Sequence, residues 1–577
     1  MLTIKKMIAK ALCDGIAALG APVAPTSDEL ALMLEYPPDE GMGDLALPCF
    51  KLSRTLRRAP VQIAAALCDS LNGLACVERA EAVNGYLNIT VSNKYLLTDV
   101  MGEIFAKGKS YGGSDVGKGK TVVLDYSSPN VAKPFHIGHL GTTVIGHALK
   151  KLHEFAGYDC VGINYLGDWG TQFGKLIVAY KKWGNREQIL QGGIDKLVEL
   201  YVQINNAISG NEEKGSPADP ALADEARAEF RKLELGDEEN LALWKWFIEI
   251  SLEEYQKTYK QLGIEFDSYK GESFYTDKMP AQVQKLRDMG LLKIDDGASI
   301  VDLAPYNMPP CLILKRDGST LYPTRDIAAA VYRKNEYNFD KAIYVTSAGQ
   351  SLHFAQWFKV VEMMGYDWHD ELVHVPYGTV SINGAKLATR TGNVVLLKDL
   401  FKAAIEEVSS IMEQKNPNLE NKAEIAEAVG VGAIVFYYLS NSRIKDINFV
   451  MEDALNFDGN TGPYAQYTYA RTCAVLRRAG ESEGEMKITS SDEASLLKIL
   501  SKFPERVQSA IADYEPSVIT RYILDVAAAF NRFYHNCPIL SAEDKDVRAP
   551  RVAITRAANI VLGNAFPLIC LKTMEKI

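Results

Sequence analysis

Two histidines three positions apart, His136 and His139, stand at the start of a segment with helical periodicity. At this spacing both imidazoles can face one ligand. A helix start also presents unpaired N–H groups and about half a positive charge, which suits a phosphate. Gly138 between the histidines leaves room for a flat base or a ribose to approach the backbone. The tetrapeptide His136-Ile137-Gly138-His139 (HIGH) therefore predicts a nucleotide site in a chain that has no GxxxxGK[ST] loop.

The chemistry that suits this motif is displacement at the α-phosphate of ATP, in which a carboxylate attacks and pyrophosphate leaves. Two histidines would stabilise the charge that grows on the phosphate oxygens. An HxGH tetrapeptide can also arise by chance, and histidines on helices are more often structural than catalytic. Its position directly after a strand and at a helix start favours the catalytic interpretation.

The elements around the motif predict a strand, helix, strand unit. A strand is expected at 121–124, a helix from about Gly138 to Ala156, and a second strand at 160–163. Gly157 is the expected helix stop. The helix prediction rests on an apolar stripe at a spacing of three to four residues, formed by Ile137, Leu140, Val144, Ala148, Leu152 and Phe155.

The whole chain is predicted to be an α/β protein of three domains. An N-terminal α+β domain occupies residues 1–112, and a Rossmann-like, doubly wound parallel-sheet domain occupies 118–400 with a helical insertion at 181–300. Further strands of that sheet domain are expected at 311–314 and 342–345. Beyond residue 400 the pattern is helical without a convincing strand, so 401–577 is predicted to be a helical bundle.

Composition excludes several other classes of protein. The 577 residues are 47% hydrophobic and 24% charged, which is typical of a soluble protein, and no apolar run approaches a membrane span. The start of the chain lacks the features of a signal peptide, so we expect a cytoplasmic protein without membrane contact. The net charge of −10 argues against indiscriminate nucleic-acid coating. The nine cysteines show no zinc-ligand spacing, and no protein metal site is predicted.

Four segments closely resemble signatures of the class I arginyl-tRNA synthetases. They occur in the family's order and together cover nearly the whole chain: 125–140 (DYSSPNVAKPFHIGHL), 165–174 (YLGDWGTQFG), 321–326 (LYPTRD) and 457–467 (FDGNTGPYAQY). The resemblance implies an arginine–tRNA ligase that forms arginyl-adenylate from arginine and ATP. It then loads the terminal adenosine of tRNA(Arg). The first domain would contact the tRNA elbow, and activation would require bound tRNA.

The resemblance also implies which residues grip arginine: Asp125, Ser128, Asn130, Tyr322, Asp326 and Gln350. Their types fit the substrate, because a guanidinium is a planar cation with five donors that needs carboxylate, amide and hydroxyl oxygens around it. A buried carboxylate left unpaired would reject a smaller neutral amino acid without an editing domain. The first carboxylate is often Glu in relatives and is Asp125 here. Considered singly, each residue favours a structural role instead: Asp326 that of a surface or N-cap carboxylate, and Tyr322 that of a core aromatic.

The second class I signature, a lysine-rich KMSKS loop, corresponds to residues 386–392 and follows a probable hairpin at Asn383-Gly384. Its second lysine is absent. In the family a lysine just before the HIGH motif is the proposed replacement, and here that residue is Lys133. We therefore predict His136, His139 and Lys133 as catalytic, with Gly138, Lys386 and Arg390 completing the ATP site. Magnesium bound with ATP would neutralise the phosphates.

The helical C-terminal part resembles the family's anticodon-binding domain. Tyr464, Tyr467 and Arg471 are the predicted tRNA-binding residues, because RNA loops are read by stacking bases on aromatic rings. Aromatics at helical spacing are more often core residues. We expect a monomer. Two alternatives remain: another class I synthetase or nucleotidylyltransferase, and a synthetase-like RNA-binding protein that has lost activity.

Overall fold

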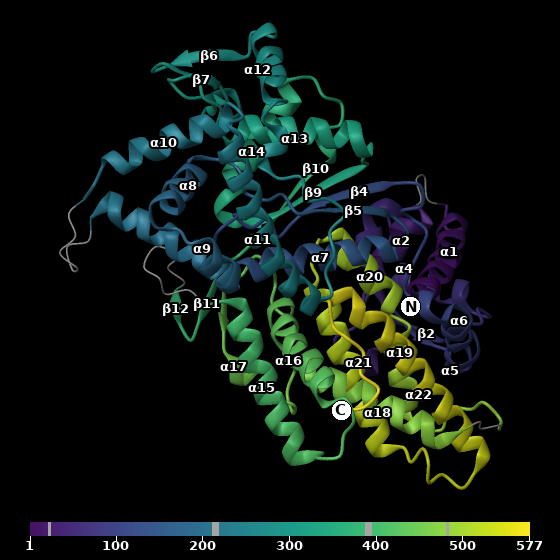
Figure 1. The fold of residues 1–577 in the computed structure, drawn as a ribbon. Helices are drawn as coiled ribbons and strands as arrows, with labels where there is room; N and C mark the ends of the chain where they lie inside the picture. The colour runs from purple at the N-terminus through teal and green to yellow at the C-terminus, as the bar shows by residue number, and fades with distance from the viewer. Residues whose placement is uncertain (21–24, 211–217, 387–394, 481–483) are drawn as a thin grey trace.

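The computed structural model describes residues 1–20, 25–210, 218–386, 395–480 and 484–577 (Figure 1). Its centre is a four-stranded parallel sheet with the order β10-β9-β4-β5. The strands are β4 (Thr121–Asp125), β5 (Asp159–Ile163), β9 (Lys341–Ser347) and β10 (Leu372–Tyr377). The strand order reverses between β4 and β9, so the crevice beyond their carboxyl ends is the place where doubly wound sheets bind ligands.

The predicted strand, helix, strand unit is confirmed. A 3-10 turn at Ile137–His139 leads into α7 (Leu140–Phe155), and Gly157 has the positive φ of 88° that stops the helix. Of the predicted stripe, Phe155 alone is only half-buried. The helix is buried on nearly every side because it lies between the sheet and the C-terminal helices. A Cβ at Gly141 would meet the Tyr438 hydroxyl at 2.2 Å, so the close approach requires glycine there.

The strand predicted at 311–314 exists, but its placement in the parallel sheet is wrong. β8 (Cys311–Leu314) closes a separate antiparallel sheet of order β6-β7-β8 with β6 (Leu292–Asp295) and β7 (Ala298–Val301). A short apolar run indicates a strand without indicating its partner. After β8 the chain forms α13 (Tyr322–Tyr337), returns to the parallel sheet as β9 and continues into α14 (Ser351–Met363).

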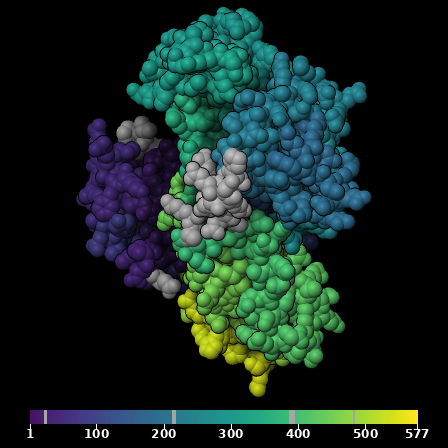
Figure 2. Space-filling view, turned by 60° about the vertical axis from the view of Figure 1, so that its left-hand side comes forward, coloured from purple at the N-terminus to yellow at the C-terminus, as the bar shows by residue number. Residues whose placement is uncertain are grey.

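The helical insertion leaves the sheet domain after β5 and forms a lobe of its own. Its main helices are α8 (Thr171–Trp183), α9 (Arg186–Ser209), α10 (Ala221–Glu234) and α11 (Glu238–Leu262), followed by a 3-10 turn at Glu272–Tyr275 and by α12 (Met279–Asp288). In Figure 2 the insertion (blue, on the right) and the N-terminal domain (purple, on the left) lie on opposite sides of the molecule.

The N-terminal domain is α+β, as predicted. Its antiparallel sheet has the order β1-β3-β2. Its strands are β1 (Leu45–Pro48), β2 (Val77–Val83) and β3 (Tyr86–Val91), and its helices are α1 (Leu2–Ala18), α2 (Ser27–Met33), α3 (Ser53–Leu56), α4 (Pro60–Cys68), α5 (Asn93–Tyr95) and α6 (Met101–Lys107). The domain is joined to the C-terminal helices by ion pairs at 2.8 Å, Lys5 with Glu505 and Asp44 with Lys498.

The C-terminal part is helical, with one exception to the prediction. It contains α15 (Leu397–Lys415), α16 (Lys422–Leu439), α17 (Met451–Ala454), α18 (Gly462–Ala479), α19 (Ser491–Leu500), α20 (Phe503–Ala512), α21 (Ser517–Asn536) and α22 (Lys545–Ala565). The exception is the three-residue strand β13 (Ile447–Phe449), which pairs in parallel with β11 (Val380–Ile382) of the catalytic domain. A run this short carries too little periodicity to be recognised in the sequence.

From the sequence, no apolar run is expected to approach a membrane span, but one C-terminal segment, Lys545–Ile569, is long and apolar enough by length and composition. However, 61% of its apolar window is buried inside the protein, and its helix α22 contacts α18, α19 and α21. Its apolar character is therefore that of a core helix.

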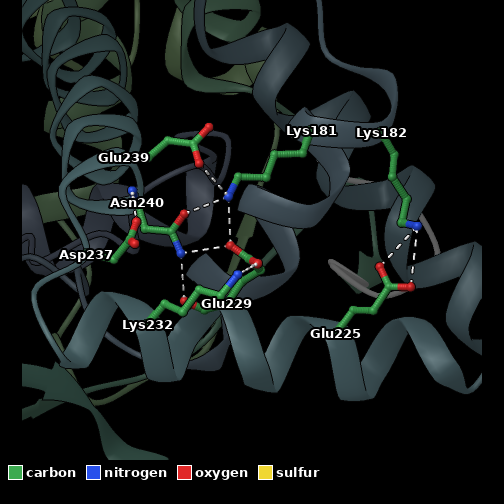
Figure 3. A network of polar contacts seen from close by, with 8 residues as sticks. All are labelled: Lys181, Lys182, Glu225, Glu229, Lys232, Asp237, Glu239 and Asn240. Atoms are coloured by element: carbon green, nitrogen blue, oxygen red, sulfur yellow. Dashed lines mark hydrogen bonds and ion pairs between the residues drawn. The ribbon is translucent and has the colours of Figure 1, made fainter.

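A buried polar network holds the helices of the insertion together (Figure 3). The Lys181 ammonium on α8 lies 2.8 Å from the Glu229 carboxylate on α10 and donates a 2.9 Å hydrogen bond to the Asn240 side chain on α11. The Asn240 amide, which is fully buried, donates back to Glu229 at 2.8 Å. Burial alone would raise the pKa of Glu229, but the hydrogen bonds from Lys181, Lys232 and Asn240 outweigh it and lower the pKa to about 2.

Replacing Glu229 by Gln should therefore lower the free energy of unfolding at neutral pH by about 1–3 kcal/mol, because a charge-assisted buried network is lost. The pKa of this carboxyl is lower in the folded protein than in the unfolded chain. Its stabilisation is therefore present above about pH 4.5 and lost as the pH falls toward about 2. Denaturant titrations followed by tryptophan fluorescence at several pH values measure both effects.

The matched control is Glu225→Gln on the same helix, which removes an exposed pair with Lys182 at 3.0 Å (Figure 3). Its cost should stay below about 0.5–1 kcal/mol. Equal losses for the two variants would show that the buried network is no more stabilising than a surface ion pair.

Candidate active site

The loop between β4 and α7 is strained. Ser127, Ser128 and Ala132 have positive φ values of 69°, 48° and 58°, although none of them is glycine. Each such conformation costs on the order of 1 kcal/mol or more and persists only where the surroundings fix it. Backbone strain of this kind gathers at functional sites, and here it brings the end of β4 and the HIGH turn to the same crevice.

Helix α11 of the insertion holds the strained loop through residues spaced four apart, which share one face of the helix. The Ser251 hydroxyl accepts the N–H of Ala132 at 3.1 Å. The Tyr255 hydroxyl lies 2.8 Å from the Asn130 carbonyl oxygen and 2.7 Å from that of Lys133. Tyr259, one turn further, lies with its hydroxyl 2.8 Å from that of Ser127. The insertion is thus part of the support of the site.

The two HIGH histidines lie against each other, with ring centroids 3.9 Å apart. The backbone N–H of Gly138 donates to Nδ1 of His136 at 3.0 Å, and that of His136 donates to Nδ1 of His139 at 3.1 Å. Burial lowers the pKa of His136 to about 4 and that of His139 to about 3. Both rings are therefore neutral near pH 7. Because each Nδ1 accepts a hydrogen bond, each proton resides on Nε2, which can donate to a phosphate oxygen.

Lys133 lies close enough to both histidines to lower their pKa values further. Burial lowers the pKa of Lys133 itself. The structure thus brings together the three residues predicted as catalytic. The ammonium places a cation beside the start of α7, where the helix dipole also favours an anion.

Both carboxylate oxygens of Asp125, the last residue of β4, have partners within the protein. Its Oδ2 forms a 2.8 Å ion pair with Arg333 of α13, which is 1% exposed, and its Oδ1 accepts a 2.9 Å hydrogen bond from Ser128. The guanidinium of Arg333 also lies 5.0 Å from the ring centroid of Tyr165 and 5.6 Å from that of Tyr344. Burial disfavours the charge of Arg333, but Asp125 and the tyrosines outweigh it and raise its pKa.

Two further carboxylates border this pair. Oδ2 of Asp326 on α13 lies 2.6 Å from Nε2 of His353 on α14. The Glu272 carboxylate forms a 2.7 Å ion pair with the guanidinium of Arg325. Burial raises the pKa of Glu272 to about 7. The positive charge of Arg325 lowers this pKa, but the negative charges of Asp326 and Asp168 raise it again. Among the described residues, this part of the crevice thus gathers the carboxyl groups of Asp125, Asp168, Glu272 and Asp326 around the guanidinium groups of Arg325 and Arg333.

The remaining predicted arginine contacts lie at the rim. Tyr322, at the start of α13, is 66% exposed, and Gln350, directly before α14, and Asn130 are exposed as well. Asn130 is nevertheless fixed, because its backbone forms a parallel bridge with Gly167. The helix starts of α7, α13 and α14 thus all present predicted site residues.

The second signature begins in the predicted hairpin, which is confirmed as β11 and β12 (Ala385–Lys386). Lys386 lies on β12, whereas Arg390 lies outside the described residues. Directly after that segment the chain returns to the HIGH turn: the N–H of Ile137 donates to the Val395 carbonyl at 3.1 Å, and that of Leu397 donates to the Phe135 carbonyl at 3.0 Å. The backbone at 395–397 is therefore joined to the nucleotide motif.

The predicted tRNA residues meet far from this crevice, in a cavity of about 450 Å³ between α15, α18 and α21. The Arg471 guanidinium lies between two half-exposed rings, 5.0 Å from the centroid of Tyr467 and 5.1 Å from that of Tyr534. Asn531 donates a 2.9 Å hydrogen bond to the Tyr464 hydroxyl and accepts one from Arg471. The three predicted residues line one cavity together.

Sequence reasoning missed several site residues: Tyr165, Asp168, Glu272, Arg333 and His353. Two of them had a usable signal, because Arg333 lies seven residues after Asp326 and His353 three after Gln350, spacings that share a helix face. Tyr165 and Asp168 lie in the segment 165–174, whose resemblance to the family implied no role for them. Glu272 had no signal in the sequence, because it reaches the crevice from a 3-10 turn of the insertion.

A doubly wound sheet with a HIGH turn at its switch point is typical of the class I aminoacyl-tRNA synthetases and of the related nucleotidylyltransferases. Residues 100–451 match the family model described as tRNA synthetases class I (R), catalytic domain. Residues 2–91 match the arginyl tRNA synthetase N terminal domain and 465–577 the DALR anticodon binding domain. The chain therefore belongs to the arginyl-tRNA synthetase family.

Relatives and solved structures agree with this assignment. The chain is 48% identical over 552 residues to an arginine–tRNA ligase of Alkaliphilus metalliredigens, covering 95% of this chain and 96% of the relative. It is 47% identical over 560 residues to that of Clostridioides difficile, covering 96% of each. The fold is similar to that of Thermus thermophilus arginyl-tRNA synthetase, with a TM-score of 0.83 at 23% identity over 99% of this chain and 100% of the other.

The packing of Gly167 against Asn130 gives a test of the site. A Cβ at Gly167 would lie 2.2 Å from Oδ1 and 3.3 Å from Cα of Asn130, so Gly167→Ala must move the Asn130 side chain out of its place. We expect kcat/KM for the amino acid to fall by about tenfold to a hundredfold, because small displacements of a positioned site are costly. Gly102→Ala, where a Cβ meets nothing within 4 Å, is the control and should leave the kinetics unchanged. Equal behaviour of the two variants would refute the positioning role of this contact.

Proposed function

We propose that this protein activates L-arginine with ATP to arginyl-adenylate and transfers it to the 3'-terminal adenosine of tRNA(Arg), releasing AMP and pyrophosphate. The observation that supports this most is the charge of the crevice beside the HIGH turn. There, among the described residues, the carboxyl groups of Asp125, Asp168, Glu272 and Asp326 gather around the guanidinium groups of Arg325 and Arg333. A substrate guanidinium would be attracted to this cluster of carboxyl groups.

In the first step, an oxygen of the arginine carboxylate attacks the α-phosphorus of ATP while the bond to the bridging oxygen of pyrophosphate breaks. The Nε2–H groups of His136 and His139 would donate to the phosphate oxygens as their charge grows. Gly138 would leave room for the nucleotide. The ammonium of Lys133 would stabilise the leaving pyrophosphate, with Lys386 and Arg390 as further cations. Mg²⁺ would arrive with ATP, held by phosphate oxygens, and neutralise them.

In the second step, a hydroxyl of the terminal ribose attacks the carbonyl carbon of the adenylate and AMP leaves. Arginine would be selected by Asp326, with Glu272 added to the predicted set and Tyr322 covering the side chain from the rim. Asn130, Ser128 and Gln350 would bind the backbone end of the amino acid. Asp125 supports this pocket through Ser128, since its own oxygens are paired with Arg333 and Ser128.

For tRNA we propose two contact regions on either side of the catalytic domain. The cavity with Tyr464, Tyr467 and Arg471 would receive anticodon bases, which stack on rings and guanidinium planes. The N-terminal domain would contact the elbow, and it exposes the edge-to-face pair Phe50 and Tyr86, with centroids 5.4 Å apart. We propose that the protein acts as a cytoplasmic monomer with domains at 1–112, 118–400 and 401–577.

The decisive experiment is the exchange of pyrophosphate into ATP, measured with arginine in the presence and absence of tRNA(Arg). We expect arginine-dependent exchange with tRNA present. No exchange in either case would refute the enzyme in favour of an inactive RNA-binding protein, whereas exchange driven by another amino acid would refute only the specificity.

Replacing Asp326 by Asn tests the arginine pocket. Loss of one charge-assisted contact of about 2–4 kcal/mol should lower kcat/KM for arginine by about thirtyfold or more. The KM for ATP should stay within about twofold, since the carboxylate belongs to the amino acid side of the crevice. An equal loss for both substrates would mean that Asp326 supports the fold of the site instead of binding arginine.

The tRNA surface is tested by Arg471→Met, which removes the cation between two rings. Stacking is worth about 1–3 kcal/mol per base, so kcat/KM for tRNA should fall by about fivefold to a hundredfold. The matched control is Arg477→Met on the same helix, which is half-exposed and lies 3.7 Å from Glu575. If both variants lose the same amount of tRNA affinity, the effect is a general loss of positive charge.

A further inference from the structure

We propose that Arg333 is a positioning residue for arginine binding: its buried guanidinium fixes Asp125, and Asp125 directs the proton of the Ser128 hydroxyl away from the substrate. The inference rests on the proposed function, in which Ser128 binds the backbone end of the amino acid. It adds that the affinity for arginine, and not that for ATP, depends on a guanidinium that lies behind the pocket.

The Arg333 guanidinium faces the end of β4 from helix α13. Its side chain is 1% exposed, and Nη1 lies 2.8 Å from Oδ2 of Asp125. Three tyrosine rings surround it, with centroids at 5.0 Å for Tyr165, 5.6 Å for Tyr344 and 5.9 Å for Tyr275. A buried ion pair is often no more stabilising than apolar side chains of the same volume. What this pair does supply is a single orientation of the carboxylate, because the rings and the planar cation leave each other little freedom.

The other oxygen of Asp125 connects the ion pair to the loop before the HIGH turn. The Ser128 hydroxyl donates to Oδ1 at 2.9 Å, and the competing acceptor is the Tyr126 carbonyl oxygen at 3.3 Å. The backbone N–H of Tyr165 donates to Oγ of Ser128 at 3.1 Å. Ser128 itself has a left-handed backbone conformation, with a φ of 48°. The direction of its hydroxyl proton therefore depends on where Asp125 holds Oδ1.

The direction of this proton decides what Ser128 can offer a substrate. A hydroxyl has one proton and two lone pairs. With the proton toward Asp125 and one lone pair bound to the Tyr165 N–H, the second lone pair stays available. An ammonium group has only donors, so the α-ammonium of arginine needs such an acceptor. If Asp125 moves, the proton can turn to the Tyr126 carbonyl, and the lone pairs turn with it.

The residues on the ATP side of the crevice are held by other contacts. Helix α11 holds the backbone of Ala132 and Lys133 through hydroxyl groups at 3.1 and 2.7 Å. The two HIGH histidines accept backbone N–H groups of their own turn at 3.0 and 3.1 Å. None of these bonds involves Arg333 or Asp125. Loss of the Arg333 guanidinium should therefore weaken the binding of arginine and leave that of ATP nearly unchanged.

The experiment measures aminoacylation of tRNA(Arg) by the full chain, with KM determined for arginine and for ATP. Arg333→Ala should raise the KM for arginine by about tenfold or more, because a contact to a charged group of the amino acid is weakened. The KM for ATP should stay within about twofold. Millimolar guanidinium ion, which replaces the missing group beside Asp125, should restore most of the affinity for arginine. The wild type is assayed in parallel, because guanidinium also competes with arginine at Asp326.

Two controls separate ion pairing from packing. Urea is planar and similar in size to guanidinium but has no charge, so it should not rescue Arg333→Ala. Arg551→Ala removes another largely buried guanidinium, which lies 2.7 Å from the fully buried Glu493 in the C-terminal domain. This variant should keep the wild-type KM for arginine, and guanidinium should not lower it.

The double variant Asp125→Asn/Arg333→Met makes the test independent of whether Arg333→Ala folds, because it leaves no unpaired buried charge. It should show the same selective rise in the KM for arginine, since no ion pair fixes residue 125. Guanidinium should not rescue it, because the carboxylate that would hold the ion is gone.

A wild-type KM for arginine in the double variant, an equal rise in the KM for ATP, or equal rescue by urea and guanidinium would each overturn the proposal. So would a folded Arg333→Ala variant that guanidinium does not rescue. Absence of arginine-dependent aminoacylation by the wild type would instead refute the proposed function.

Discussion

The loop between β4 and α7 is the constraint on which the rest of the site depends. Three residues in left-handed backbone conformations turn the chain sharply enough for Asp125, Lys133 and the HIGH turn to reach one crevice. That conformation is unfavourable by itself, and the contacts that stabilise it come from α11, more than a hundred residues later in the sequence. The helical insertion therefore fixes the geometry at the phosphate site as well as forming one wall of the protein.

The second organising principle is the placement of charge. The side proposed to bind phosphate has neutral imidazoles whose Nε2–H donors are set by backbone hydrogen bonds, and the ammonium of Lys133 lies beside them. The side proposed to bind the amino acid gathers four carboxyl groups around the guanidinium groups of Arg325 and Arg333. Both groups of side chains are largely buried, and a charge without a partner is costly away from water. Their free energy therefore depends on whether a bound ligand compensates the charge. With arginine bound as proposed, a neutral amino acid of similar size would leave that cost in place, which would give discrimination without a second site for editing.

The sequence predicted the elements that have strong local signals. The apolar stripe of α7, the three-domain order and the paired histidines all follow from periodicity and from motif position, and the structure has each of them. The strand at 311–314 was predicted correctly as a strand but assigned to the wrong sheet, because hydrogen-bond partners are decided by contacts distant in sequence. β13 was missed because a run of three residues, with two buried side chains and one exposed between them, is too short to show an alternating pattern.

The candidate site was predictable only in part, for a related reason. Side chains that follow a strand or begin a helix could be placed together by topology, as with Asp125 and His136. Glu272 and Arg333 reach the crevice from other elements, and their roles depend on which charges meet there. The left-handed conformations of Ser127 and Ser128 also have no sequence signal, since glycine is absent and the stabilising partners are remote.

The pairing of β13 with β11 has a consequence for how the protein can be divided. The hairpin with Lys386 belongs to the catalytic domain, but its inner strand completes its hydrogen bonds on residues 447–449, after α15 and α16. A catalytic fragment that ended near residue 400 would expose an unpaired strand edge beside the nucleotide motif, a template for association with other chains. A fragment with the catalytic domain must therefore also contain α15, α16 and β13. The domain boundaries along the sequence are thus not the boundaries at which the protein can be cut into stable fragments.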